Sequence, residues 1–476
     1  MTERPASGPI SGLLRQLDLW TPIALGVLVL VIILSPQERL PKLNHLIQDY
    51  VIAGQGRGPN SELVIVAIDD KSIAALGRWP WRRALHAELL DRIGADHPRA
   101  IGLDVLFTEP DLVHPDDDAL LAAAIERNHP VVLPVFMQSF GSQRRVMSPV
   151  PPIAELAAGL GHAHLKVDHD GVVRSTHLPE PVDERTLPQF SRILLDVGNA
   201  HAPTSLAARS ADAVTTAQQQ DYLMIPYAGP VGHFYRISAI DVIRGVFPEG
   251  TFHNKYVLIG VTATSIGDQY ATPTTHDSAL MPGVEILANI TDAMLQGITL
   301  RPASNMQNAS FNLLFVGIAL IGFLLLSPFY ALLLTIFLAL ASVFSTFFLA
   351  GFAGILFAPA AGILGLISIY PLWSWHRLNT VSRFLMVEYE SLQRGQHIPF
   401  TPSNPLFRDP LSRRIAALEG ARQQLQNLHQ FVVTSLERLP YPTIICDTSG
   451  LIRFANQAAA RHFDMTDSDL LLNRYL

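Results

Sequence analysis

The chain has 476 residues, of which 49% are hydrophobic and only 16% are charged, and its net charge is −7. Soluble domains carry roughly 25% charged residues, so the deficit suggests that part of the chain lies in lipid. The negative balance and the lack of a long basic tract argue against nucleic-acid binding, and a single cysteine, Cys446, excludes an intrachain disulfide.

The first apolar stretch, residues 17–34, is long enough to span a bilayer. It follows a short N-terminal segment, residues 1–16. A cleaved signal peptide is the alternative, but no small-residue cleavage site follows Leu34, where the sequence continues Ser35-Pro36-Gln37-Glu38-Arg39. We therefore predict a retained transmembrane helix.

A second apolar block is too long for one span. Ser327-Pro328 and the Gly351–Gly354 region divide it, which predicts transmembrane helices at 309–326, 329–350 and 354–374. No Asp, Glu, Lys or Arg occurs between Pro302 and His376. Because charges inside a membrane usually mark ion or proton paths, their absence favours anchoring and relay over transport.

The flanking charges predict the orientation. Arg4 and Arg15 precede the first helix, and Arg377 and Arg383 follow the last. Basic residues favour the cytoplasmic side, so four spans place both termini in the cytoplasm and residues 35–308 outside it.

Residues 35–308 contain short apolar runs with the composition of buried parallel strands. They are separated by helical patterns at 84–96 and 117–128, and strand–helix alternation predicts an α/β domain with a mainly parallel sheet. The predicted strands are 63–68, 100–105, 131–135 and 256–261.

Ligands of such sheets tend to bind beyond the carboxyl ends of the strands. Several carboxylates, with two tryptophans, fall at or after predicted strand ends. The candidate ligand-binding residues are Asp69, Asp70, Trp79, Trp81, Asp104, Glu109 and Asp268. Carboxylates with tryptophans could bind a cation or a cationic ligand. Taken singly, each is also compatible with helix capping, loop hydrogen bonds or core packing.

We expect no catalytic, metal or cofactor site in residues 1–476. The chain has no nucleophile elbow and no Walker loop. Asp116-Asp117-Asp118 precedes an alanine-rich helix and favours a cap over a metal cluster. Four histidines lie close together but match no usual zinc spacing. They are His162, His164, His169 and His177.

Residues 376–410 are predicted to be a cytoplasmic linker that begins as a helix, 376–393, and is then broken by prolines. Residues 411–438 form a predicted signalling helix with one apolar heptad series and a second series that is only half apolar. The first series is Leu418, Leu425, Val432 and Leu439. A weak parallel coiled coil would make the chain a homodimer; the alternative is a single amphipathic helix packed on its own domain.

Residues 439–476 open a new pattern. It predicts a strand ending at Asp447, a turn at Ser449-Gly450, a strand over 451–454 and a helix over 457–463. In this order the segment resembles the start of a PAS domain, an α+β fold. We expect the rest of that sheet to lie beyond Leu476, because half a domain cannot bury its apolar face.

Residues 40–300 contain a series of short passages typical of one family of sensor domains. They are Ile68-Asp69-Asp70-Lys71-Ser72, Gly77-Arg78-Trp79-Pro80-Trp81, Ile101-Gly102-Leu103-Asp104-Val105-Leu106-Phe107, Glu109-Pro110, Asp170-Gly171-Val172-Val173-Arg174, Ile225-Pro226-Tyr227-Ala228-Gly229-Pro230, Val257-Leu258-Ile259-Gly260, Asp268-Gln269-Tyr270-Ala271-Thr272-Pro273 and Pro282-Gly283-Val284-Glu285. In these passages the chain resembles the CHASE2 family of extracytoplasmic sensor domains. The resemblance implies a multi-pass bacterial inner-membrane receptor with a periplasmic sensor domain. It names no ligand and transfers no binding residue.

The resemblance also implies a cytoplasmic effector, for which we expect a histidine kinase missing from this fragment, with ATP, magnesium and a response-regulator partner. A diguanylate or other nucleotide cyclase, or a non-enzymatic membrane scaffold, is the alternative. The sequence contains no His-Glu-x-x-x-Pro motif and no Gly-Gly-Asp/Glu-Glu-Phe motif. His429 is followed by Gln430-Phe431 in place of an acidic residue, so we do not predict it to be a phosphoacceptor.

Overall fold

The structure is a computed structural model. It describes residues 9–140, 143–182, 185–200, 222–264, 266–275, 279–394, 426, 430–447 and 451–463. The chain divides into two compact units, one made of Thr21–Pro371 and the other of Met1–Trp20 with Leu372–Leu476.

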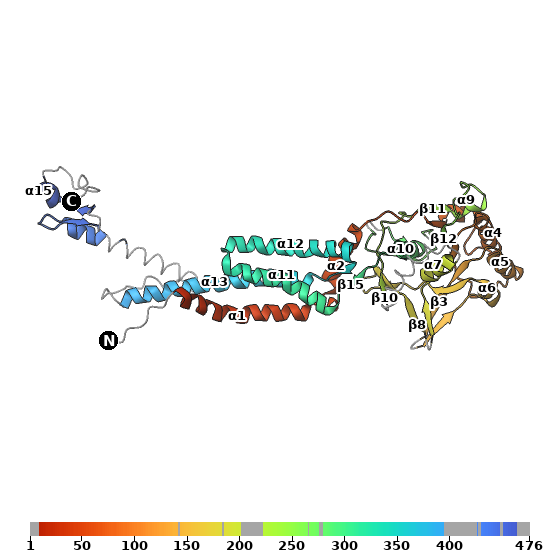
Figure 1. Cartoon of the computed structure of the whole chain (residues 1–476), viewed down its shortest axis with the longest axis horizontal. Coiled ribbons are helices and arrows are strands. Elements are labelled where there is room, and N and C mark those ends of the chain that lie inside the picture. Colours follow the sequence, from red (N-terminus) through yellow and green to blue (C-terminus); the bar gives the residue numbers. More distant parts are fainter. Residues whose placement is uncertain are drawn as a thin grey trace. The chain divides into compact units, whose positions relative to one another are not determined.

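A seven-stranded sheet forms the centre of the α/β region (Figure 1). Its order is β11-β1-β12-β2-β3-β4, with β5 also paired to β3, and only the β3–β4 pair is antiparallel. The strands are β1 (Leu63–Ile68), β2 (Ala100–Asp104), β3 (Val131–Phe140), β4 (Gln143–Met147), β5 (Gly159–His162), β11 (Arg236–Ser238) and β12 (Tyr256–Val261).

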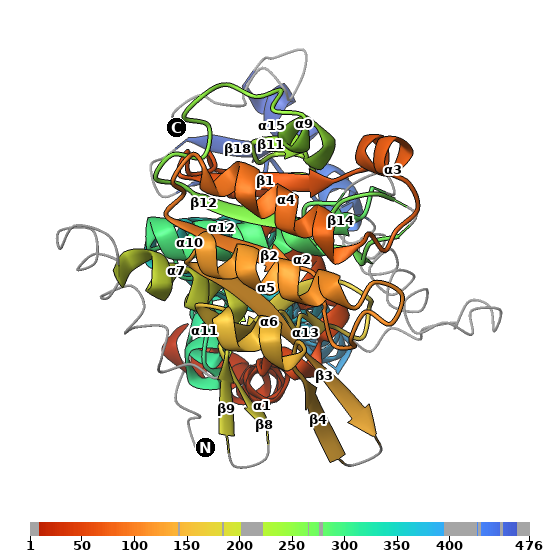
Figure 2. The same cartoon turned by 90° about the vertical axis from the view of Figure 1, so that its right-hand side faces the viewer.

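Helices cover both faces of this sheet, because side chains alternate between faces along each strand. Val64, Val66 and Ile68 pack in one core with α4 (Arg83–Gly94) and α5 (Asp116–Arg127), which lie side by side in Figure 2. This layer also contains α3 (Asp70–Leu76), α6 (Pro151–Leu156) and α9 (Ala239–Ile243).

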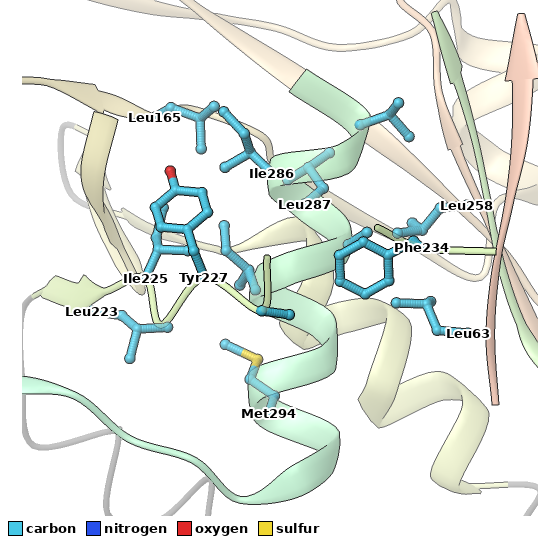
Figure 3. Packing of buried hydrophobic residues seen from close by; sticks show 14 of the residues in the cluster. Leu63, Leu165, Leu223, Ile225, Tyr227, Phe234, Leu258, Ile286, Leu287 and Met294 are labelled. Atoms are coloured by element: carbon cyan, nitrogen blue, oxygen red, sulfur yellow. The ribbon is translucent and has the colours of Figure 1, made fainter. Parts of the chain in front are cut away.

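Leu63 and Leu258 pack in the second core with α7 (Phe190–Ala200) and α10 (Gly283–Gln296). Figure 3 shows α10 between Leu258 on one side and Tyr227 on the other. The result is a three-layer α/β/α arrangement, which confirms the predicted mixed α/β class and mainly parallel sheet.

Short strands complete the α/β region. They are β6 (Lys166–Val167), β7 (Val173–His177) and β10 (Tyr222–Met224) in one sheet, the pair β8 (Pro179–Val182) and β9 (Arg185–Pro188), and the pair β13 (Gln269–Tyr270) and β14 (Met281–Pro282).

Four long helices contain the apolar stretches. They are α1 (Pro9–Leu34), α11 (Asn305–Leu325), α12 (Pro328–Ala353) and α13 (Ala360–Arg394). By length and composition, α11 and α12 could each cross a membrane. α1 begins before the predicted residue 17, and α13 begins after residue 354 and continues through Pro371 to Arg394. α13 therefore also contains the helix expected at 376–393.

The turn between α12 and α13 is structured. Gly354 ends α12 with a left-handed conformation (φ 63°), which glycine adopts without a Cβ penalty. β16 (Ile355–Leu356) then pairs with β15 (Arg301–Pro302), the segment that leads into α11. This pairing joins the two ends of the α11–α12 hairpin.

Four buried amide side chains surround the start of α13, and we call them the amide cluster. Asn44 and Gln48 lie on α2 (Pro41–Gly54), and Asn308 and Asn312 lie on α11.

The amide cluster binds the backbone around the start of α13. Asn308 accepts from the Ala358 amide (2.9 Å). Asn312 accepts from the Gly362 amide (3.1 Å) and donates to Ser35 Oγ (3.2 Å). Gln48 donates to the Phe357 carbonyl (3.2 Å), and Asn44 accepts from the Ala360 amide (3.2 Å). Buried amides of this kind require partners, so the cluster fixes how these segments meet.

The second unit contains helical residues 430–437 and the elements β17 (Ile444–Cys446), β18 (Ile452–Ala455) and α15 (Gln457–His462). Asn456 caps α15 by accepting from the Ala459 amide (2.9 Å) and also donates to the Tyr441 carbonyl (2.9 Å). The order strand, strand, capped helix agrees with the expectation, but it does not establish a PAS domain. Most of the linker 376–410 beyond Arg394, and most of the predicted signalling helix 411–438, lie outside the described residues.

Candidate functional site

Three neighbouring strands bring the predicted carboxylates to one edge of the sheet. β12 lies between β1 and β2, and all three are parallel, so their carboxyl ends meet. Asp104 is the last residue of β2, Asp69 follows β1, and Asp268 lies in the loop after β12. This is the edge at which open α/β sheets bind ligands.

A cavity of about 360 Å³ opens here, and we call it the edge pocket. It contains four of the seven predicted residues, namely Trp79, Trp81, Asp104 and Asp268. The rest of its lining is Pro80, Arg83, His86, Val105, Leu106, Phe107, Ala163, Leu165, Val261, Ile266, Gly267, Tyr270, Gly283, Val284 and Leu287. Its volume lies within the usual range for small-molecule sites.

Asp104 and Asp268 make the edge pocket acidic. Burial, and then the charge of Asp268, raise the pKa of Asp104 to about 7. Burial, and then these two carboxylates, also raise the pKa of Tyr270 above its ordinary value. Within the described part of the chain, neither the Asp104 nor the Asp268 side chain has a hydrogen-bond or ion-pair partner.

Aromatic rings form one wall of the edge pocket. The Trp79 and Trp81 ring centroids are 5.5 Å apart at 67°, and His86 lies edge-on to Trp79 (5.7 Å) and to Phe107 (5.4 Å). The Trp81 indole N–H donates to the Gly77 carbonyl (3.0 Å), which fixes that ring. The wall therefore places aromatic rings of fixed relative orientation beside two carboxylates.

His86 is buried in this wall. It is only 2% exposed, and among the described residues its Nδ1 has no hydrogen-bond partner. Burial, and then the nearby Arg83 charge, lower the pKa of His86 to about 4, so the ring is neutral at neutral pH. The His86 ring therefore lines the edge pocket as a neutral aromatic group.

Arg83 is the cation that lines the edge pocket, but its charge is compensated on another side. It pairs with Asp118 and with Asp111 (3.4 Å), and it donates to the Glu109 carbonyl. Its guanidinium also lies 5.7 Å from the Phe107 ring centroid. The uncompensated charge facing the edge pocket is therefore negative.

The other three predicted residues do not line the edge pocket. Asp69 is the N-cap of α3 and accepts from Ser72 N (2.8 Å) and from the hydroxyl groups of Ser72 (2.6 Å) and Ser238 (2.8 Å). Burial alone would raise the pKa of Asp69, but these hydrogen bonds together lower it. Asp70 is exposed and accepts from Thr264 Oγ1 (3.3 Å), and Glu109 is exposed. The contacts of Asp69 are therefore those of a helix cap, as the alternative interpretation of this residue expected.

Sequence reasoning did not find Arg83, His86, Phe107 or Tyr270. His86 lies on the buried face of α4 with Ala87, Leu89, Leu90 and Ile93. The sequence signal that could have identified His86 is a histidine at a position where the helical pattern of α4 expects an apolar residue. The positions of Phe107 and Tyr270 depend on loops whose course the sequence does not predict.

The triple aspartate differs in detail from the predicted cap. Pro115 is the N-cap of α5 and makes no capping hydrogen bond through its side chain, while Asp116, Asp117 and Asp118 occupy the first turn. Their negative charges interact favourably with the positive end of the helix dipole. Asp117 also pairs with Arg82 (3.1 Å), which lowers its pKa below the ordinary value.

A second cavity of about 700 Å³ is lined by residues of η1 (Gln37–Arg39), α2, β6, β7 and the start of α11. Arg174 borders it, and its guanidinium is bound by Asp49 (2.7 Å), Asp168 (2.8 Å) and Asp170 (2.7 Å). These four residues are the Arg174 cluster. His45, Asp168 and Asp170 are close enough to hold a metal, as are Asp111, His114 and Asp117. In both groups the carboxylates already bind arginines.

Comparison with known families gives one match, to the CHASE2 domain, over residues 24–327. The matched region runs from α1 through the α/β region to Ser327, just after α11. Searches of curated proteins and of solved structures gave no match.

Proposed function

Because the chain belongs to the CHASE2 domain family, whose function is extracellular sensing, we propose that it is a transmembrane receptor that binds an extracytoplasmic ligand in the edge pocket and relays the signal to a cytoplasmic histidine kinase. The family match is the observation that carries the sensing part of this proposal, and it includes the α/β region with α1 and α11 on either side of it. The kinase is inferred from the PAS-like sequence of residues 439–476.

We further propose four membrane spans, formed by α1, α11, α12 and the apolar first part of α13. α11 and α12 have suitable length and composition, and residues 20–34 of α1 are a shorter apolar helix. With arginines at both ends of the set, this arrangement puts the sensor domain in the periplasm of a bacterial inner membrane and both termini in the cytoplasm.

A chain of contacts supports the relay. The N-terminal residues of α10, Gly283 and Val284, line the edge pocket. Farther along α10, the fully buried Asp292 binds Arg57 (2.7 Å), in the segment that follows α2. α2 carries two members of the amide cluster, which bind the start of α13. A ligand that binds two arrangements of these elements unequally would shift their populations.

The kinase, with its ATP and magnesium, would follow the PAS-like segment, and residues 411–438 would pair two chains in parallel. The test is ATP labelling of the full-length native protein in membranes with magnesium, followed by acid. Acid-labile label supports a histidine kinase that acts on a response regulator. If the folded protein takes no label, the kinase proposal fails, and GTP turnover would then support a cyclase.

The role of the edge pocket is tested by filling it. A Cβ added at Gly283 would lie at an ordinary 3.6 Å from the Tyr270 ring, so Gly283→Leu should narrow the cavity without a backbone clash. We expect this variant to lose the response of kinase activity to the stimulus. Gly58→Leu is the matched control, because a Cβ there meets no atom within 4 Å. An unchanged response in Gly283→Leu would contradict the proposed site.

A further inference from the structure

We propose that the edge pocket binds a small organic cation through an ammonium group that carries N–H donors. This inference rests on the proposed receptor function and specifies its ligand class. It is carried by two neighbouring features: two carboxylates, and a wall of aromatic rings that includes a neutral histidine.

The electrostatics favour a cation. Asp104 and Asp268 face the edge pocket without partners among the described residues, whereas Arg83 is compensated by Asp111 and Asp118. Because the pKa of Asp104 is raised to about 7, this group is partly protonated at neutral pH, and a bound cation would stabilise its charged form. A bound anion would be repelled by that charged form, and in a half-buried site such repulsion is screened less than in water.

The aromatic wall supplies the second part of an ammonium site. Trp79 and Trp81 lie at 67° to each other, so their faces are presented in different directions. Indole faces attract an ammonium group, and this attraction strengthens when the group is desolvated. A metal ion gains nothing from such a wall, and Ca²⁺ requires six to eight oxygen ligands.

The carboxylates distinguish an ammonium that bears N–H groups from a quaternary one. Asp104 and Asp268 both line the edge pocket, and their oxygens accept hydrogen bonds. Two such acceptors beside one cavity match an N–H-bearing cation, whereas tetramethylammonium would leave both without a hydrogen bond.

The volume of the cavity sets the size of the ligand. About 360 Å³ accommodates a molecule of several non-hydrogen atoms, and a bare ion would leave most of the cavity unfilled. Together these features point to a small amine.

The test is calorimetric titration of the full chain in lipid nanodiscs with n-butylammonium and 1,4-diaminobutane. Their comparators are 1-butanol, tetramethylammonium and MgCl₂. We expect saturable binding of the two amines and at least tenfold weaker binding of each comparator. Asp104→Asn and Asp268→Asn should each weaken amine binding about 10- to 100-fold. Asp70→Asn, at the same edge but outside the edge pocket, should bind as the unaltered chain does.

Three results would overturn the ligand class: no binding of either amine, equal binding of 1-butanol or tetramethylammonium, or amine affinity unchanged in both aspartate variants. Asp268 is exposed, so its variant is expected to fold and keeps the test decisive. A Gly283→Leu chain that loses signalling although no amine binds would refute only the ligand class. Amine binding with no effect of Gly283→Leu on kinase activity would refute only the proposed receptor site.

Discussion

Asp104 links the stability of the α/β region to pH. Its pKa rises from an ordinary 3.8 to about 7 in the folded chain, because burial and Asp268 disfavour the charged form. Between these values the folded chain binds more protons than the unfolded chain. Its contribution is therefore fully present below pH 3.8 and is lost as the pH rises through about 7.

Asp104→Asn should remove this pH dependence. We expect the variant to be more stable than the unaltered chain at pH 8, by on the order of 1–3 kcal/mol, and the difference to vanish near pH 4. Denaturant unfolding of the full chain in detergent, followed by tryptophan fluorescence at several pH values, measures this. A constant difference between the two chains at all pH values would contradict the assignment.

The ion pair between Asp170 and Arg174 gives the opposite dependence of stability on pH. The Arg174 side chain is 3% exposed, and hydrogen bonding to it lowers the pKa of Asp170 far below 3.8. That contribution is present above pH 3.8 and is lost as the pH falls toward the folded-state pKa. Arg174→Met should cost about 3–5 kcal/mol of unfolding free energy at pH 7, because it leaves carboxylates together without their cation.

Arg192→Met is the control for Arg174→Met. Arg192 pairs with Asp196, which is 49% exposed, and such surface pairs contribute at most about 1 kcal/mol. Thermal unfolding of the full chain compares the two variants. Equal losses would show that the Arg174 cluster stabilises the α/β region no more than an exposed ion pair does.

The sequence predicted the lining of the edge pocket in part. Asp104, Asp268, Trp79 and Trp81 could be grouped because strand ends in a parallel sheet share an edge. Asp69 could not be separated from them, since its serine partner Ser238 is far along the chain. Carboxylates that cap helices and carboxylates that face cavities have the same sequence signature.

At the scale of elements, strands β1 and β12 and helices α4 and α5 follow closely from hydrophobic patterning. The short strands of residues 159–188 do not, because two to five residues show no clear period. The alternation of strands and helices also does not reveal that β12 lies between β1 and β2, since sheet order depends on the connections rather than on the elements.

The amide cluster should decide how firmly α11 holds the turn before α13. Asn312→Leu keeps the branched shape of the side chain but removes its bonds to the Ala358 carbonyl, the Gly362 amide and Ser35. We expect a loss of about 1–3 kcal/mol and faster amide exchange in residues 355–362, with exchange in β1 and β12 unchanged. Hydrogen-exchange mass spectrometry of the full chain in nanodiscs measures both.

Asn305→Leu is the matched control, because Asn305 is an exposed residue of the same helix. Its exchange pattern should equal that of the unaltered chain. If Asn312→Leu accelerated exchange throughout the sheet instead, the amide cluster would be part of the general core rather than a local joint.

At the scale of the whole molecule, the proposed orientation can be tested with the single cysteine. Cys446 should react with a membrane-impermeant maleimide only after spheroplasts are permeabilised. Val113→Cys in a Cys446→Ser background should react in sealed spheroplasts, since Val113 is 79% exposed in the α/β region. Labelling of Cys446 in sealed spheroplasts would overturn the four-span arrangement.

The position of β12 also constrains biosynthesis. Val64 pairs with Val257 on β12, and the other neighbour of β1 is β11, where Ile65 pairs with Arg236, so β1 has no native neighbour until residue 236 has been made. At about 5–20 residues per second, a ribosome needs on the order of ten seconds to translate from β1 to β11 and β12. During that interval the apolar strand β1 lacks both of its partners. Newly made chains should therefore depend on chaperones that hold unfolded segments, and a nascent chain stopped before Tyr256 should be removed by proteases.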